Sequence, residues 1–196
     1  MNALILIDIQ NDFLLGGSLE VPKGDEIIDN INSIMDNYSM VVATKDWHPK
    51  NHISFASNHN NKKAGQIITI NNLDQILWPD HCIKDSKGSE FSEKLDFHKI
   101  HKIFYKGVDS NIDSYSGFYD NGKIRSTGLS NFLKKNNINQ VDIVGLATDY
   151  CVKYSSIDAY NEGFKINVLR FCVRGISVET TETAFKEMKD IGISII

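Results

Sequence analysis

The chain has 196 residues, a formal net charge of -4, 41% hydrophobic residues and 23% charged residues. This length suits one domain with a sizeable core, and we expect a single domain over residues 1–196. The negative charge gives no basic face and argues against a nucleic-acid partner. No apolar run reaches the roughly 20 residues that span a bilayer. Three cysteines without CxxC spacing fit free thiols in a reducing cytoplasm, and we expect no signal peptide.

The first strand is predicted at Ala3–Ile9, an almost continuous apolar run that is typical of a strand covered on both faces. It carries one acid, Asp8, near its carboxyl end. An unpaired carboxylate is costly to bury, so we expect Asp8 to have a partner or to cap the turn that follows. Apolar residues at helical spacing then predict a helix within Asp25–Tyr38. Met40–Thr44 predicts the second strand.

Polar residues after the second strand suggest a metal site. Asp46 and His48 lie two residues apart, so in an extended chain both side chains point the same way. An oxygen and a nitrogen ligand placed like this suit a divalent transition metal, although such a pair also occurs by chance. His81 is a third candidate ligand. The segment Gln66–Leu77 shows no clear pattern.

The next predicted strand, Ile100–Tyr105, ends at Lys106. A lysine at a strand end is usually a solvated edge residue. Here a long polar and aromatic stretch, Val108–Asn121, follows it and is typical of a cleft wall. Ser126 or Thr127 is the expected cap of the helix that comes next.

Cys151 is predicted to lie where a strand, Gln140–Val144, gives way to a helix, Val152–Glu162, which is expected to end at Gly163. The unpaired N–H groups and the positive dipole of a first helical turn favour a thiolate over a thiol. The same groups can stabilise an oxyanion. The alternative is a small buried thiol that only fills space behind the strand.

The chain is predicted to end with a strand at Lys165–Arg170, a helix capped by Thr180, and a strand at Ile193–Ile196. Alternating strands and helices predict a three-layer α/β/α fold with a mainly parallel, doubly wound sheet. Ligands bind such sheets beyond the carboxyl ends of the strands. Four candidate side chains fall at those ends: Asp8, Asp46, Lys106 and Cys151. Four such placements together favour one functional site.

Five stretches of the chain together resemble a known family. They are LILIDIQNDF (Leu4–Phe13), TKDWHPKNHISFA (Thr44–Ala56), WPDHC (Trp78–Cys82), FYKGVDSNIDSYSGF (Phe104–Phe118) and GLATDYCV (Gly145–Val152). The chain is similar to the isochorismatase-like cysteine hydrolases and, within them, to the nicotinamidases. The resemblance covers nearly the whole chain.

The resemblance implies two groups of residues. The implied catalytic triad is Asp8, Lys106 and Cys151. The implied ligands of one divalent metal, Zn²⁺ first with Mn²⁺ or Fe²⁺ as alternatives, are Asp46, His48 and His81. Some relatives use a histidine in the position of His52 as a further ligand, but the spacing here resembles relatives that use water instead.

The resemblance also implies how a substrate is held. It implies a cis peptide between Leu146 and Ala147, which aims the Ala147 N–H into the site, where it forms an oxyanion hole with the Cys151 N–H. Three side chains are implied to line the ring pocket: Phe13, Trp78 and Tyr150.

The implied activity is hydrolysis of nicotinamide to nicotinate and ammonia through a cysteine thioester, as in NAD salvage, by a cytoplasmic enzyme that can form a homo-oligomer. One alternative is a related amidohydrolase that acts on ureido or carbamoyl substrates. The expected set of metal ligands argues against it, because related amidohydrolases without a metal do not need those residues. The other alternative is a non-catalytic protein that binds a metal or ligand. The intact Asp–Lys–Cys set argues against it, because a protein that only binds a ligand does not need a nucleophile.

Overall fold

The computed structural model describes residues 1–70 and 72–196 of the chain. Its main feature is a six-stranded parallel sheet with the strand order β5-β2-β1-β6-β7-β8. The strands are β1 (Asn2–Ile7), β2 (Val41–Asp46), β5 (Lys102–Lys106), β6 (Gln140–Leu146), β7 (Lys165–Arg174) and β8 (Ser194–Ile195). The parallel sheet confirms the predicted fold class.

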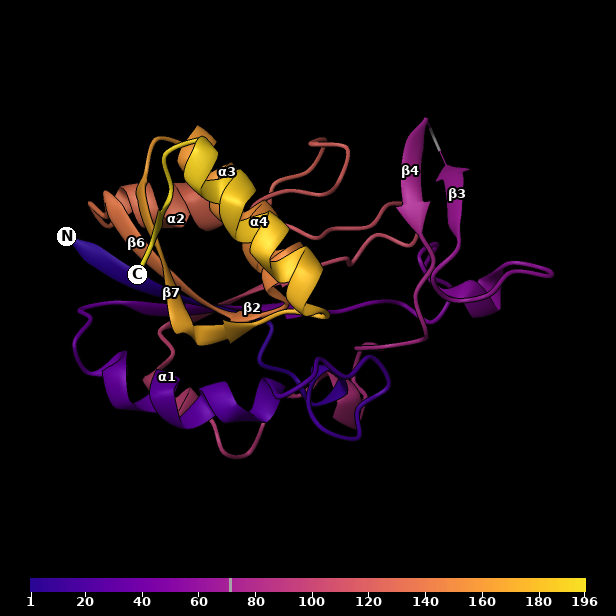
Figure 1. Ribbon diagram of the computed structural model, residues 1–196, viewed down its shortest axis with the longest axis horizontal. Helices are drawn as coiled ribbons and strands as arrows, with labels where there is room; N and C mark the ends of the chain where they lie inside the picture. The colour runs from indigo at the N-terminus through magenta and orange to yellow at the C-terminus, as the bar shows by residue number, and fades with distance from the viewer. Residues whose placement is uncertain (71) are drawn as a thin grey trace.

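Helices cover both faces of the sheet (Figure 1). They are α1 (Ile28–Met35) on one face, and α2 (Leu129–Lys135), α3 (Lys153–Asn161) and α4 (Val178–Asp190) on the other. Alternate side chains of β1 pack into the helix layers on the two sides of the sheet, because successive residues of a strand point to opposite faces. Ile5 belongs to the same core cluster as Leu129 and Ala184, and Leu6 belongs to the opposite cluster with Ile28. This two-sided burial explains why the β1 sequence is apolar without alternation.

Short helical turns make up much of the connecting chain. They are Asn11–Phe13, Gly24–Ile27, Ala56–Asn58, Lys87–Ser89, Phe97–Lys99 and Thr148–Val152. The turn at Gly24–Ile27 takes the place of the first residues of the helix predicted within Asp25–Tyr38. The α-helix proper begins only at Ile28.

Two helix caps differ from the prediction. The cap residue of α2 is Gly128, which has φ 86°, rather than Ser126 or Thr127. The cap residue of α4 is Ser177, whose hydroxyl oxygen accepts the N–H of Thr180. Thr180 itself is therefore inside the first turn, and the neighbouring Ser177 has the extended backbone that a cap residue needs.

A β-hairpin that the sequence pattern did not reveal lies apart from the six-stranded sheet (Figure 1). It consists of β3 (Ile67–Ile70) and β4 (Leu73–Ile76), which pair antiparallel. Gln75 is the buried residue of these two strands, while the isoleucines of β3 are exposed or only partly buried, so no regular alternation of apolar and polar residues marks the hairpin in the sequence. Within the described residues, none of the helices combines the length and apolarity needed to cross a bilayer.

The carboxyl ends of the central strands meet at one edge of the sheet. Asp46 of β2 and Lys106 of β5 are direct partners in the sheet register. Ile7, the last residue of β1, is the partner of Gly145 in β6. Asp8 and the turn at Thr148–Val152 therefore leave the sheet side by side, close to Asp46 and Lys106.

Candidate active site

Lys106 lies at the centre of a buried polar cluster. Its Nζ lies 2.5 Å from Asp46 Oδ1, 3.0 Å from Asp8 Oδ2 and 3.5 Å from Cys151 Sγ. Nζ also donates to the backbone oxygen of Ser114 at 3.0 Å. Burial lowers the pKa of Lys106, but Asp46 and Asp8 outweigh burial and raise this pKa well above its ordinary value. Lys106 is thus a fixed positive charge between two carboxylates and a thiol.

Asp8 is fully buried just beyond β1, with a left-handed backbone at φ 50°. Its Oδ1 accepts a hydrogen bond of 2.6 Å from the hydroxyl of Thr44. Burial raises the pKa of Asp8 to about 6, while Lys106 opposes this rise. A carboxyl group with this pKa can both take up and release a proton near neutral pH.

Cys151 lies in the π-helical turn Thr148–Val152, which leads directly into α3. Only 8% of the residue is exposed. Burial raises the pKa of its thiol well above the ordinary value, although Lys106 lowers it. Burial and the carboxylates of Asp8 and Asp46 therefore favour the thiol in this site, in the direction opposite to the effect expected of a helix start. The thiol needs a nearby acceptor for its proton, and Asp8 lies close to it.

The segment before this turn approaches β1 very closely. The peptide bond between Leu146 and Ala147 is cis, as the resemblance implied. Gly145 has φ 121°, and a Cβ at this position would lie only 2.1 Å from the backbone oxygen of Ile7. Residue 145 must therefore be glycine for β6 to reach the site beside β1.

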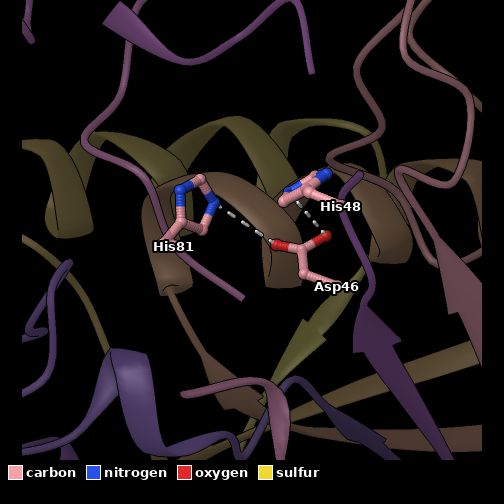
Figure 2. Close-up of side chains that lie close together, drawn as sticks. All are labelled: Asp46, His48 and His81. Carbon is pink, nitrogen blue, oxygen red and sulfur yellow. Dashed lines mark ion pairs between the residues drawn. The ribbon is translucent and has the colours of Figure 1, made fainter. Parts of the chain in front are cut away.

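Asp46, His48 and His81 form a group with metal-ligand geometry, and Figure 2 shows the carboxylate of Asp46 between the two imidazole rings. Asp46 Oδ1 lies 3.6 Å from His48 Nε2, and Asp46 Oδ2 lies 3.9 Å from His81 Nε2. The other ring nitrogen of each histidine bonds to a backbone oxygen: His48 Nδ1 to Gly107 at 2.9 Å, and His81 Nδ1 to Pro79 at 2.8 Å. Backbone partners of this kind orient metal-binding histidines, so the three residues fit a divalent transition metal.

Charges within this group favour the metal-binding forms of Asp46 and His81, whereas Asp46 outweighs burial at His48 and raises the pKa of that imidazole. Burial raises the pKa of Asp46, but Lys106 and His48 outweigh burial and hold this pKa below its usual range. Burial and the neighbouring His48 lower the pKa of His81 to about 4, which leaves its imidazole neutral at pH 7. The backbone of Asp46 is held by Gln10, a residue that sequence reasoning missed. The Gln10 amide donates to the Asp46 oxygen and accepts from the Asp46 N–H, both at 2.8 Å.

His52 has a different set of contacts from the three grouped residues. Its Nδ1 lies 2.7 Å from the Ser54 hydroxyl, and its ring centroid is 4.1 Å from that of His48. Together with His48 and Asp113 it forms a second buried group whose ligand atoms lie within 4.8 Å of one another. Asp113 accepts a 2.9 Å hydrogen bond from Gln75 of the hairpin. Sequence reasoning did not identify Asp113, since it lies in a loop with many polar residues.

A pocket with about 420 Å³ of empty volume opens beside Cys151. Its walls include the three predicted ring-pocket residues, Phe13, Trp78 and Tyr150. The rings of Trp78 and Tyr150 meet edge to face at 5.0 Å. Wall residues that were not predicted are Leu19, Val21, Asp113, Tyr115 and Ile176. The pocket is thus largely apolar, and Cys151, Asp46 and His81 also line it.

Comparison with known proteins gives a consistent result. The model of the isochorismatase domain family matches residues 2–196. The nicotinamidase of Escherichia coli is 40% identical over 201 residues, which cover 98% of this chain and 93% of that protein.

Two solved structures have the same fold over the whole chain. A nicotinamidase/pyrazinamidase structure from Acinetobacter baumanii has a TM-score of 0.97 at 40% identity, and the match covers 100% of this chain and 95% of that one. A pyrazinamidase of Pyrococcus horikoshii in complex with zinc has a TM-score of 0.82 at 36% identity, with coverage of 100% and 98%.

Proposed function

Since this chain belongs to the isochorismatase family, we propose that it is an amidohydrolase that converts nicotinamide to nicotinate and ammonia. The contacts of Lys106 are the observation that carries this proposal. One ammonium group lies within 3.5 Å of the Cys151 thiol and of the carboxylates of Asp8 and Asp46. This arrangement supplies a nucleophile, a base and a charge in one buried site, as cleavage of an amide requires.

Cys151 begins the reaction as a thiol. Asp8 takes its proton as the sulfur forms a bond to the carboxamide carbon. The negative charge moves to the carbonyl oxygen, which accepts hydrogen bonds from the N–H groups of Ala147 and Cys151. Lys106 favours the ionised forms of both partners during this transfer. The pKa of Asp8, about 6, suits a base that acts near neutral pH.

The proton held by Asp8 then passes to the amide nitrogen. The C–N bond breaks and ammonia leaves, with the acyl group now bound to Cys151 as a thioester. Asp8 next accepts a proton from water, whose oxygen attacks the thioester carbon. The C–S bond breaks, the sulfur regains a proton, and nicotinate is released.

Asp46, His48 and His81 are the residues that would hold the metal, and their one oxygen and two nitrogen donors support Zn²⁺, with Mn²⁺ and Fe²⁺ as alternatives. A metal bound there would supply a Lewis-acidic position for the pyridine nitrogen and so orient the substrate. Phe13, Trp78 and Tyr150 hold the ring from its apolar sides. Cys151 and the other two cysteines are free thiols, which supports action in a reducing cytoplasm.

Ammonia release from a panel of small amides, with and without added divalent metal, tests this proposal. Nicotinamide should be the best substrate of the panel. The panel should include ureido and carbamoyl compounds of similar size. Faster turnover of one of those compounds than of nicotinamide would refute the proposed substrate, and no turnover of any amide by the metal-loaded protein would refute the proposed reaction.

A further inference from the structure

Asp149 is a buried acid two residues before Cys151, and the proposed chemistry gives it no task. Its Oδ1 and Oδ2 accept the backbone N–H of Ile176, at 3.2 and 3.0 Å. Its Oδ2 also accepts a hydrogen bond of 2.5 Å from the hydroxyl of Thr180. Asp149 therefore ties the turn that carries Cys151 to the segment between β7 and α4.

Ile176 is the residue of that segment that borders the substrate pocket, and it also lines a broad surface groove. It thus borders two open spaces, and 37% of the residue is exposed. Packing alone leaves such a side chain room to move. The backbone of the segment comes very close to its neighbours, since a Cβ at Gly175 would lie 2.0 Å from Thr181 Oγ1 and 3.2 Å from Asp149 Oδ1.

We propose that Asp149 is a positioning residue for the substrate. By holding the N–H of Ile176, it keeps the Ile176 side chain against the substrate ring at a fixed distance from Cys151. The inference rests on the proposed amide hydrolysis. It adds Asp149 to the residues that determine how tightly the substrate ring is bound. A competing explanation is that Asp149 positions Cys151 itself, because both residues belong to the same turn.

The test is a cycle of four proteins: the wild type, Asp149→Asn, Ile176→Ala and the double variant. Asparagine keeps the shape of the side chain but offers one acceptor oxygen instead of two. Asp149→Asn should raise KM for nicotinamide about tenfold, roughly the effect of one lost buried hydrogen bond, with a smaller change in kcat. When Ile176 is already alanine, the same substitution should change KM by less than about twofold, because coupled residues are not additive. An equal rise of KM in both backgrounds would overturn the proposal.

Alkylation of Cys151 by iodoacetamide separates the two explanations, since this small reagent has no ring. Its rate in Asp149→Asn should stay within about twofold of the wild-type rate, because the substitution leaves the nucleophile in place. A loss of alkylation that parallels the loss of kcat/KM would mean that Asp149 positions Cys151, which contradicts the proposal.

Asp158→Asn is the matched control. Asp158 is another buried aspartate at 5% exposure, on α3, and its carboxylate pairs with Lys123 outside the substrate pocket. This variant should keep the wild-type KM, and a similar rise of KM here would overturn a specific role for Asp149. If Asp149→Asn does not fold, Thr180→Val removes one donor to the same carboxylate at an exposed position. It should raise KM in the same direction by about two- to threefold, and an unchanged KM would count against the proposal.

Hydrogen exchange at the backbone amide of Ile176 tests the hydrogen bond between Ile176 and Asp149 without any turnover. Exchange should be at least about tenfold faster in Asp149→Asn than in the wild type. An unchanged exchange rate would overturn the proposal even if the enzyme is active. Inactivity of the wild type on nicotinamide would instead refute the proposed function, while the exchange result would still decide whether Asp149 holds Ile176.

Discussion

Thr44→Val is expected to shift the pH dependence of the reaction through Asp8. The Thr44 hydroxyl donates to Asp8 Oδ1 at 2.6 Å, and neither residue has exposed surface. This hydrogen bond favours the ionised carboxylate and so lowers the pKa of Asp8, which burial has raised to about 6. Valine has nearly the same shape as threonine but no donor. Its substitution should therefore raise the pKa of Asp8 further.

The size of the shift follows from the bond that is lost. A hydrogen bond to a charged group contributes about 1.5–3 kcal/mol, and one pKa unit corresponds to about 1.4 kcal/mol. Allowing for relaxation of the site, we expect a rise of about one unit. Activity that requires ionised Asp8 is lost as the pH falls through its pKa, so the acid limb of kcat/KM should move to higher pH. At pH 6 the fraction of plateau activity should fall from about one half to about one tenth.

The assay is ammonia release from nicotinamide at low substrate concentration between pH 5 and pH 9, with the metal concentration held saturating and constant. Thr44→Ser is the control, since serine keeps the hydroxyl and should leave the acid limb within about 0.3 units of its original position. An acid limb that does not move in Thr44→Val would refute the assignment of Asp8 as the base. An equal shift in Thr44→Ser would show that the lost methyl group, rather than the hydrogen bond, is responsible.

Three further predictions concern other parts of the molecule. Cys151→Ala should abolish ammonia release with little change in melting temperature, and an active alanine variant would exclude the thioester route. Nicotinamide should exceed benzamide by orders of magnitude in kcat/KM, because benzamide lacks the ring nitrogen. His48→Ala or removal of the metal should shrink that ratio, and a ratio that persists in verified metal-free protein would mean that a side chain recognises the nitrogen. Hydrogen bonds from Lys134, Ser130 and Tyr119 lower the pKa of Glu162 to about 2. Its contribution to stability should be full above about pH 4.5 and disappear as the pH falls towards 2. Glu162→Gln should therefore cost about 1–2 kcal/mol in urea unfolding at pH 7, a value reduced for exposure to solvent, and almost nothing near pH 2. A cost that does not vary with pH would contradict the ionic role.

The parts of the fold and site that could be predicted from the sequence depend on local patterns. The apolar run at β1 and the β-branched run at β6 each predicted a strand within a few residues of its observed bounds. Because parallel strands present their carboxyl ends at one edge, these assignments and the predicted strand at Met40–Thr44 were enough to bring Asp8, Asp46 and Cys151 together. Thr44 could also have been found in this way, since it lies two residues before Asp46 on the same face of β2.

The remaining features depend on contacts between distant segments. Gln10 holds the backbone of Asp46 across 36 residues of sequence, and Gln75 donates to Asp113 across 38. No local pattern encodes such a pair. The pKa of Cys151 illustrates a related reason: the helix start is visible in the sequence, but the burial that raises this pKa comes from the folded chain.

The place of β1 in the sheet has a consequence for synthesis on the ribosome. β1 lies between β2 and β6, yet about 130 residues separate its end from the start of β6. At roughly 5–20 residues per second, one edge of this very apolar strand waits on the order of ten seconds for its partner. During that interval a growing chain can pair β1 with β2 but leaves the other edge open to aggregation. Chaperone capture of nascent chains should therefore be strongest after β2 emerges and should decline once β6 is complete.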